Sequence, residues 1–335
     1  MKTKAVLMTG TGDPDVLQMR EIDIVWPRQQ GDVLVRLMAA GLNPADTFFR
    51  ALGTYVESDG PVVLGHDGAG VVEAVGAGVT EVSIGDRVCF CNGGIGGDPG
   101  TYSEFAVVPQ DLLVKLPDAV DFHTAAAFPL VAITAWEALV ERAGVGQAEQ
   151  VLIHGGAGGT GQMAIQVARL RGARVAATVS TEEKAELVSS LGVERSILYK
   201  SEPFVKASMD WTNERGLDVA LDNVGPEVMI ETFGAMAPYG RVVTLMGTPA
   251  DDTELTAYNR NLSIHNVMML TPMWFGLHDH MKRQADIVRQ LVPRLVTGEI
   301  RVNIQAVYPL ADAAEAHRKL EQGGSSGKIV LSVSE

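Results

Sequence analysis

A cluster of glycines between residues 155 and 161 is the part of the sequence whose residue types and spacing point most directly to chemistry. Five glycines fall within these seven positions. Three of them fit the pattern G-x-G-x-x-G, in which the first allows a tight turn, the second lets the backbone approach a pyrophosphate and the third lets a helix pack closely on a strand. The pattern predicts a dinucleotide site, with Gly156, Gly158 and Gly161 at the glycine positions and Gly159 and Thr160 between the last two.

The residues on either side of the glycines fit such a site. The apolar run Val151–Ile153 is typical of a strand buried in a parallel sheet. After the glycines, Met163, Val167 and Leu170 follow the spacing of a buried helix face. A pyrophosphate would then lie at the helix N-terminus, where free N–H groups and the positive end of the helix dipole favour an anion. An ordinary flexible loop is the alternative, but the flanking elements favour the binding site.

The end of the next predicted strand indicates which dinucleotide is bound. NAD enzymes usually carry an acidic residue about 20 residues after the glycines, where it holds the ribose 2′-hydroxyl. This sequence has Val179, Ser180 and Thr181 there, with Lys184 one helical turn later. A 2′-phosphate would be attracted by Lys184, Ser180 and the Tyr199 hydroxyl. We therefore expect NADP(H). The alternative is that Lys184 is solvated and that Glu182 or Glu183 turns inward.

Two further segments follow predicted strands of the same domain. Asn223 and Val224 come directly after the strand that ends at Asp222, and Leu245 and Gly247 end the next strand. Ligands of doubly wound folds bind at the carboxyl ends of the strands. We expect both segments to line the cofactor, with plain turns as the alternative.

The order of elements predicts two differently built domains. Residues 1–125 contain short strands separated by Gly, Pro and Asp, whereas residues 126–262 alternate strands with helices. Such alternation predicts an α/β domain with a doubly wound parallel sheet, which ends with a strand at Leu262–Leu270. Residues 263–335 return to a mixed pattern, with a helix from His278 to Val296 interrupted at Pro293. We assign them to the domain formed by residues 1–125.

Composition excludes several classes of protein. The 335-residue chain is 46% hydrophobic and 20% charged, which is ordinary for a globular protein. Its formal net charge is −14 and it has no run of Lys or Arg, which argues against nucleic acid or an anionic membrane as a partner. The apolar runs are too short to span a bilayer. Two cysteines, Cys89 and Cys91, favour a reducing compartment, so we expect a cytoplasmic protein.

Several motifs together resemble a known family. They are Gly41–Arg50, Gly65–Gly70, Gly85–Val88, the glycine cluster and Gly327–Leu331. In order and spacing they resemble the medium-chain dehydrogenase/reductases, specifically the zinc-independent quinone oxidoreductases related to zeta-crystallin. The resemblance implies a GroES-like, mainly β partial barrel, a Rossmann domain and a cleft between them for nicotinamide and substrate. It also implies a homodimer, in which Leu262–Leu270 would extend the sheet across the interface.

The resemblance also bears on zinc. Zinc alcohol dehydrogenases of this superfamily carry a Cys where Asn43 stands, a His-Glu pair at His66 and Asp67, and a third ligand near residues 130–132. Only His66 keeps a ligand type. Catalytic zinc needs about three protein ligands, so we expect none here. A degenerate metal site of His66 and Asp46 is the alternative to a buried polar network.

Without a metal, the acceptor must be reactive by itself. Quinones and conjugated enones are already electrophilic, whereas a simple ketone would lack the polarisation that zinc supplies. The anion left by hydride transfer needs a hydrogen-bond donor and a proton. The resemblance implies Asn43 and Thr134 beside the nicotinamide, and Lys328 among the cofactor-binding residues. The family's first tyrosine is Phe48 here, so Tyr55 is the candidate donor, with water as the alternative. Thr134 has the further alternative of bonding its own helix backbone.

An apolar segment near residue 270 supplies a candidate wall for the acceptor. Met adapts to flat apolar ligands and Trp can stack on them. We therefore place Met273 and Trp274 in the substrate pocket with Phe48 and Tyr55. Burial in the core is the alternative.

These observations predict an NADPH-dependent, zinc-independent reductase of quinones or α,β-unsaturated carbonyls. An enoyl-thioester or alkenal reductase on the same fold is one alternative. A low-turnover NADPH-binding protein with a structural or redox-sensing role is another, because the Phe48 position lacks its hydroxyl. The alternatives differ in which acceptors oxidise NADPH.

Overall fold

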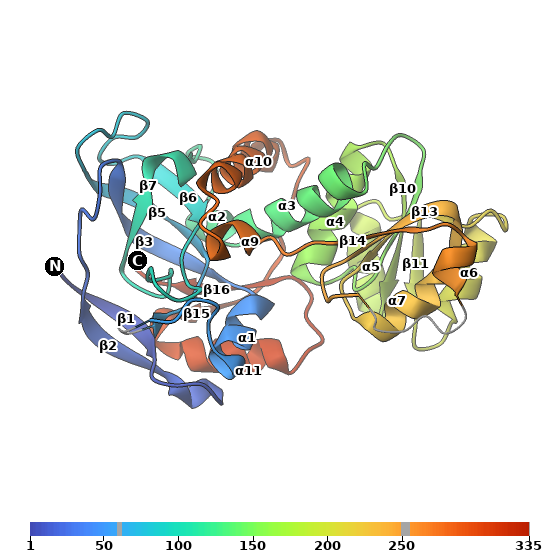
Figure 1. Cartoon of the computed structure of the whole chain (residues 1–335), viewed down its shortest axis with the longest axis horizontal. Helices are drawn as coiled ribbons and strands as arrows, with labels where there is room; N and C mark the ends of the chain where they lie inside the picture. Colours follow the sequence, from blue (N-terminus) through green and yellow to red (C-terminus); the bar gives the residue numbers. More distant parts are fainter. Residues whose placement is uncertain (59–61, 249–254, 335) are drawn as a thin grey trace. The chain divides into compact units, whose positions relative to one another are not determined.

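The computed structural model describes residues 1–58, 62–248 and 255–334, and the chain forms two compact units (Figure 1). The first unit consists of Met1–Leu130 and Leu270–Glu335, and the second of Val131–Met269. The boundaries expected from sequence, after residues 125 and 262, lie a few residues earlier. The first boundary falls inside helix α3 (Pro129–Trp136).

The second unit is built on a sheet of six parallel strands in the order β11-β10-β9-β12-β13-β14. This is the doubly wound arrangement, with β9 at the point where the strand order reverses, and it confirms the predicted fold class. Buried side chains of the strands and of helices α6 and α7 pack together in its core. The elements after α3 and a π-helical turn (Glu137–Arg142) are β9 (Gln150–Ile153), α4 (Gly159–Leu170), β10 (Arg174–Val179), α5 (Glu182–Ser190), β11 (Arg195–Leu198), α6 (Phe204–Trp211), β12 (Leu217–Asp222), α7 (Pro226–Phe233), β13 (Met236–Thr244), α8 (Thr256–Asn259) and β14 (Ser263–Asn266).

The last strand of this sheet is shorter than predicted. β14 ends at Asn266, whereas the apolar pattern predicts a strand through Leu270. The Val267 N–H still bonds the Thr244 carbonyl at 3.0 Å, after which the chain turns. Met269 and Leu270 are buried in that turn, so their apolar character reflects burial without strand pairing.

The first unit is mainly β and contains a seven-stranded and a three-stranded sheet in its described part. In the larger sheet β16 lies between β15 and β3, so the end of the chain pairs with its early part. Its core gathers buried side chains of β3, β5, β6 and β7. The strands and α-helices are β1 (Lys2–Met8), β2 (Leu17–Asp23), β3 (Asp32–Leu42), α1 (Pro44–Leu52), β4 (Val62–Val63), β5 (Asp67–Val75), β6 (Arg87–Cys91), β7 (Phe105–Pro109), β8 (Val114–Lys115), α2 (Phe122–Ala126), α9 (Thr271–Trp274), α10 (His278–Thr297), β15 (Ile304–Pro309), α11 (Ala313–Glu321) and β16 (Lys328–Ser332); 3-10 turns occupy Pro14–Val16, Gln110–Leu112 and Leu310–Asp312.

Helix α10 runs unbroken through Pro293, so the predicted interruption is wrong. Proline removes one backbone hydrogen bond near the C-terminal end of the helix. The buried face formed by Ala285, Val288, Leu291 and Val292 outweighs that loss. Among the residues that the structure describes, no helix combines the length and apolar character that crossing a bilayer requires.

Candidate active site

The glycine turn connects β9 to α4 and leaves the start of the helix open. Gly158 is the N-cap residue, with φ −69° and ψ 166°, and no side chain caps the first turn of α4. The N–H groups of Gly159 and Thr160 therefore begin the helix without a capping side chain. Free N–H groups at a helix N-terminus bind anions, so the turn fits a pyrophosphate.

The three glycines of the pattern have different local surroundings. A Cβ on Gly156 would lie 2.7 Å from the Ala177 side chain, and one on Gly161 would overlap the Gly155 carbonyl oxygen. These two glycines allow the turn, β10 and α4 to pack closely. A Cβ on Gly158 would meet only the Gly155 oxygen, at 3.5 Å, so this glycine faces open space. The structure thus separates two packing glycines from one that leaves room for a ligand.

His154 supports the turn from beneath. It is buried, and its Nε2 lies 2.9 Å from the Thr232 hydroxyl, which itself donates to the Val228 carbonyl. Thr232 therefore accepts from His154, and the ring is held as the neutral tautomer with its proton on Nε2. Burial lowers the pKa of His154 to about 3. Its Nδ1 faces the Thr178 hydroxyl, which also accepts from the Gly155 N–H at 3.2 Å.

The residues predicted to meet a 2′-phosphate lie at the carboxyl ends of β10 and β11. Thr181 caps α5, its hydroxyl accepting the Lys184 N–H at 3.3 Å. The Tyr199 N–H donates to the Val179 carbonyl at 3.2 Å, which fixes Tyr199 beside the end of β10. The Lys184 ammonium is partly exposed and has no ion-pair or hydrogen-bond partner among the described residues. Glu182 and Glu183 are exposed, and recognition of a 2′-phosphate by Lys184 stays a prediction.

Asn223 presents an unused acceptor at the end of β12. Its Nδ2 donates to the His154 carbonyl at 2.9 Å, which fixes the orientation of the amide. Its Oδ1 is buried without a partner in the described structure. Asp222 accepts from the N–H groups of Val224 and Gly225, and its carbonyl accepts the Leu245 N–H. The Asn223 and Leu245 segments therefore meet at one sheet edge, near Gly247. Thr134 lies in α3 and is buried.

In the first unit, Asn43 lies between two buried charges. Its Nδ2 donates to Asp67 Oδ2 at 2.9 Å, and its Oδ1 accepts from the Lys328 ammonium. Lys328 also donates to the Leu42 carbonyl and lies 3.6 Å from Asp67 Oδ2. Burial raises the pKa of Asp67 and lowers that of Lys328, while each opposes the shift in the other. Lys328 is 4% exposed and its ammonium bonds to protein groups, so its predicted role at the cofactor stays a prediction.

Asp46 and His66 complete this polar cluster. Asp46 accepts from the Asn43 and Gly65 N–H groups, at 2.8 and 3.2 Å. His66 Nδ1 lies 2.7 Å from the Gly93 carbonyl and must donate to it, which leaves Nε2 as a buried atom without a hydrogen bond, 3.4 Å from Asp46 Oδ1. Burial raises the pKa of Asp46. Among the described residues, no group of three or more His, Cys, Asp or Glu side chains is placed to hold a metal.

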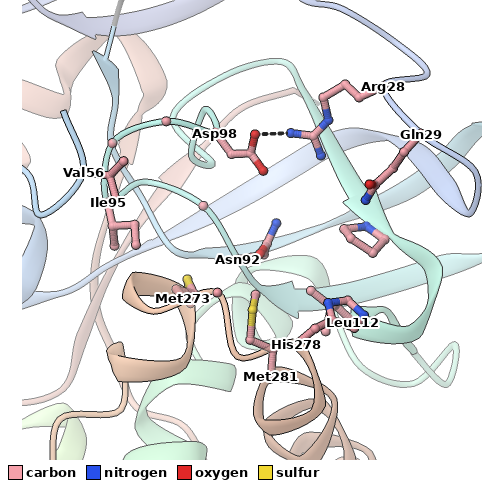
Figure 2. Close-up of a pocket in the computed structure, with 15 residues that line it drawn as sticks. Arg28, Gln29, Val56, Asn92, Ile95, Asp98, Leu112, Met273, His278 and Met281 are labelled. Carbon is pink, nitrogen blue, oxygen red and sulfur yellow. Dashed lines mark ion pairs between the residues drawn. The ribbon is translucent and has the colours of Figure 1, made fainter. Parts of the chain in front are cut away.

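The residues predicted for the substrate pocket gather in the first unit. Tyr55 stacks on Trp274, with ring centroids 4.3 Å apart, and Phe49 packs edge-on against Tyr55. Phe48 is half exposed on α1. Met273 lines a pocket of about 420 Å³ that also contains Asn92 and Met281 (Figure 2). Sequence reasoning missed Asn92, because its place beside His66 depends on the register of β5 with β6, which no local pattern indicates.

Comparisons with known proteins agree with this architecture. A model described as "Alcohol dehydrogenase GroES-like domain" matches residues 29–118, and one described as "Zinc-binding dehydrogenase" matches residues 191–331. A quinone oxidoreductase of Pseudomonas aeruginosa is 32% identical over 98% of this chain and 99% of that protein. The chain belongs to the medium-chain dehydrogenase/reductase superfamily. A 2-haloacrylate reductase of a Burkholderia species is 31% identical, over 98% of each chain.

Solved structures of this superfamily match over the whole chain. The quinone oxidoreductase of Pseudomonas syringae pv. Tomato DC3000 has a TM-score of 0.83 at 31% identity, covering 99% of this chain and 100% of that one. A mycobacterial protein described as complexed with NADPH has a TM-score of 0.85 at 30% identity, covering 98% and 100%. The resemblance predicted from sequence is confirmed. This protein is an oxidoreductase with the superfamily's GroES-like domain and its nicotinamide-binding Rossmann domain.

Proposed function

We propose that this protein is an NADPH-dependent reductase that acts on a quinone or an α,β-unsaturated carbonyl without catalytic zinc. The observation that carries the proposal is the bonding of Asn43, whose amide is held by Asp67 and Lys328. In the zinc enzymes of this superfamily a cysteine ligand occupies that position. Here a neutral amide occupies the position, and its oxygen accepts a hydrogen bond from an ammonium group. The position therefore supplies no thiolate ligand for zinc.

The second unit supplies the binding of the cofactor. The open N-terminus of α4 accepts the pyrophosphate, and Gly158 leaves it room. Lys184, Ser180 and Tyr199 favour the 2′-phosphate of NADPH over the bare hydroxyl of NADH. The orphaned Asn223 Oδ1 accepts a hydrogen bond from the bound dinucleotide. When bound, the dinucleotide supplies the hydride.

The first unit supplies the environment of the acceptor. A quinone or enone needs no Lewis acid, because conjugation already makes it electrophilic. Transfer leaves an oxyanion, which a hydrogen-bond donor stabilises and a proton neutralises. The proton comes from Tyr55 or from water, and the variant Tyr55→Phe distinguishes the two sources. A loss of about tenfold or more in kcat assigns the proton to Tyr55, and an unchanged kcat assigns it to water.

Absorbance of NADPH and NADH, followed in parallel with a quinone, an enone and a secondary alcohol, tests the proposal. We expect the quinone or the enone to oxidise NADPH, and we expect no reduction of NADP⁺ by the secondary alcohol. Metal analysis of protein purified without added metal should find less than one zinc per chain, and a chelator should leave the rate unchanged. Tight binding of NADPH without turnover on any acceptor would instead support the low-turnover alternative.

The proposal also covers the oligomeric state of the protein and its location in the cell. We propose a homodimer, which light scattering can test, and a cytoplasmic location, which cell fractionation can test. Both cysteines are free, which is compatible with a reducing compartment.

A further inference from the structure

The pocket in the first unit has a mixed lining, in which apolar side chains lie beside the side-chain amides of Asn92 and Gln29 (Figure 2). Its volume is about 420 Å³, enough for a ligand of one or two rings. Met273 and Met281 form one side, and the glycine turn after β6 forms another. Leu112 and Ile95 are buried in its lining. Methionine side chains adapt to flat ligands, so the lining suits a planar conjugated molecule.

Asn92 is a polar lining residue whose side chain has no protein partner in the described structure. The residue is only 9% exposed, and its backbone N–H donates to the His66 carbonyl at 2.8 Å. Its side-chain amide, however, makes no hydrogen bond to any residue in the described part of the chain. Because no protein group binds this amide and it lies on the pocket lining, it is available to water or to a ligand. In Figure 2 the amide lies between the two methionines and the Arg28–Asp98 pair.

The charged groups that line the pocket are already neutralised. Arg28 pairs with Asp98 and lies 3.6 Å from the buried Asp32 carboxylate. His278 Nε2 lies 2.9 Å from Asp111. Among the described lining residues, no cation is therefore left to receive an anionic ligand. A carboxylate entering this pocket would lose its hydration without gaining a counter-charge, and hydrogen bonds from neutral amides offset only part of that cost.

We propose that Asn92 anchors the acceptor through a neutral carbonyl and that the pocket selects uncharged acceptors over carboxylates. The inference rests on the proposed function, and it assigns this protein to quinones and neutral enones. Asn92 is bonded to His66 and adjoins Gly93, so the anchor is contiguous with the polar cluster around Asn43. A carboxylate acceptor, which the name 2-haloacrylate reductase implies for that relative, is disfavoured here.

Binding of two probes of equal shape tests the proposal. Acetophenone carries a neutral carbonyl where benzoate carries a carboxylate, and neither can react in the absence of cofactor. Isothermal titration of the full chain without NADPH should show acetophenone binding about tenfold or more tighter than benzoate at pH 7.5. Equal or tighter binding of benzoate overturns the selection for uncharged ligands. Because no turnover is involved, this failure differs from absence of NADPH oxidation, which would overturn the proposed function.

Substitution of the amide tests the role of Asn92. Asn92→Leu keeps a similar volume without hydrogen-bonding groups and should weaken acetophenone binding about fivefold, the effect of one net hydrogen bond. Asn92→Asp removes the donor that a carbonyl needs and should weaken acetophenone binding by at least as much. This second variant tests the assignment if the leucine variant fails to fold. The matched control is Gln290→Leu on the exposed face of α10, which should bind as the unchanged protein does. Unchanged binding in a folded Asn92 variant overturns the assignment.

Kinetics give an independent readout. In the Asn92→Leu variant we expect a higher KM for a quinone and a higher KM for an alkyl enone, with an unchanged KM for NADPH. A purely structural role for Asn92 would instead change all three quantities together, and that result would also overturn the assignment.

Discussion

Lys328 donates a hydrogen bond from its ammonium group to the side-chain oxygen of Asn43, 285 residues earlier in the chain. The same ammonium faces Asp67, which accepts from the Asn43 amide. Asn43 is therefore held at both ends of its side chain. These two contacts fix the orientation of the Asn43 amide, at the position where zinc enzymes of the superfamily carry a cysteine ligand.

Removing the ammonium should leave a buried carboxylate without its counter-charge. We expect Lys328→Met to lower the free energy of unfolding by about 3 kcal/mol, the usual cost of breaking a buried ion pair. The double variant Lys328→Met/Asp67→Asn removes both charges and should recover part of that loss. Urea unfolding monitored by circular dichroism measures both. Equal stability of the single variant and the unchanged protein would show that the pair is not needed.

The glycine turn offers a test that separates packing from binding. Gly158→Ala should leave stability nearly unchanged, because its φ is −69° and the new Cβ lies 3.5 Å from the nearest atom. The methyl group would occupy space needed by the pyrophosphate, so NADPH affinity should fall about tenfold or more. Fluorescence titration with NADPH measures this affinity. Gly146→Ala, in the same unit with its nearest atom at 3.8 Å, is the matched control.

Gly161→Ala should behave in the opposite way. Its Cβ would overlap the Gly155 carbonyl oxygen, so we expect a loss of stability of about 2 kcal/mol or more. Thermal unfolding without ligand detects this loss. A fully stable Gly161→Ala protein would contradict the close helix–turn packing.

Cofactor preference should depend on Lys184. Because the ammonium has no partner in the described structure, Lys184→Ala removes only what it contributes to a ligand. We expect the KM for NADPH to rise about tenfold, the effect of one charge-assisted hydrogen bond, with the KM for NADH unchanged. Lys206→Ala serves as the control, since Lys206 forms an exposed ion pair with Asp210 in the same unit. A parallel rise for both cofactors would contradict recognition of the 2′-phosphate.

Stability should fall in mild acid because His154 is held neutral. Burial lowers the pKa of His154 to about 3, whereas the unfolded chain has the ordinary value near 6.5. Below pH 6.5 His154 is therefore protonated in the unfolded state but not in the folded state. The free energy of unfolding declines from that pH down to about pH 3. Between pH 7 and pH 5 this one residue should cost about 2 kcal/mol. Urea unfolding at pH 7 and pH 5 measures this loss. Between these two pH values, the free energy of unfolding of the His154→Gln variant should fall by about 2 kcal/mol less than that of the unchanged protein, whatever the variant's stability at pH 7.

Local patterns made much of the fold predictable. The glycine pattern, its flanking strand and helix, and the alternation of elements in residues 126–262 lie within short windows of sequence. The apolar pattern was misleading at Met269 and Leu270, which are buried in a turn and not in a strand. At Pro293 the proline rule was misleading, because the buried apolar face of α10 stabilises the helix on both sides of the proline.

The polar cluster and the pocket could not be predicted in the same way. The contact between Lys328 and Asn43 depends on β16 pairing with β3, which no local pattern indicates. The position of Asn92 depends on the register of β5 with β6, in which Asp67 pairs with Cys91. Family resemblance pointed to Asn43 as a residue near the nicotinamide, but the two charges that hold its amide became visible only in three dimensions.

The insertion of β16 between β15 and β3 has a consequence for synthesis on the ribosome. The middle of the chain is complete in sequence while the first unit still lacks a strand of its main sheet. Until residues 328–332 emerge, the part of β3 that pairs with them has an open edge and Asp67 has no neighbouring ammonium. Premature termination before Lys328 would thus release a polypeptide with an intact dinucleotide module and an unfinished partner domain, a species that chaperones and proteases should recognise.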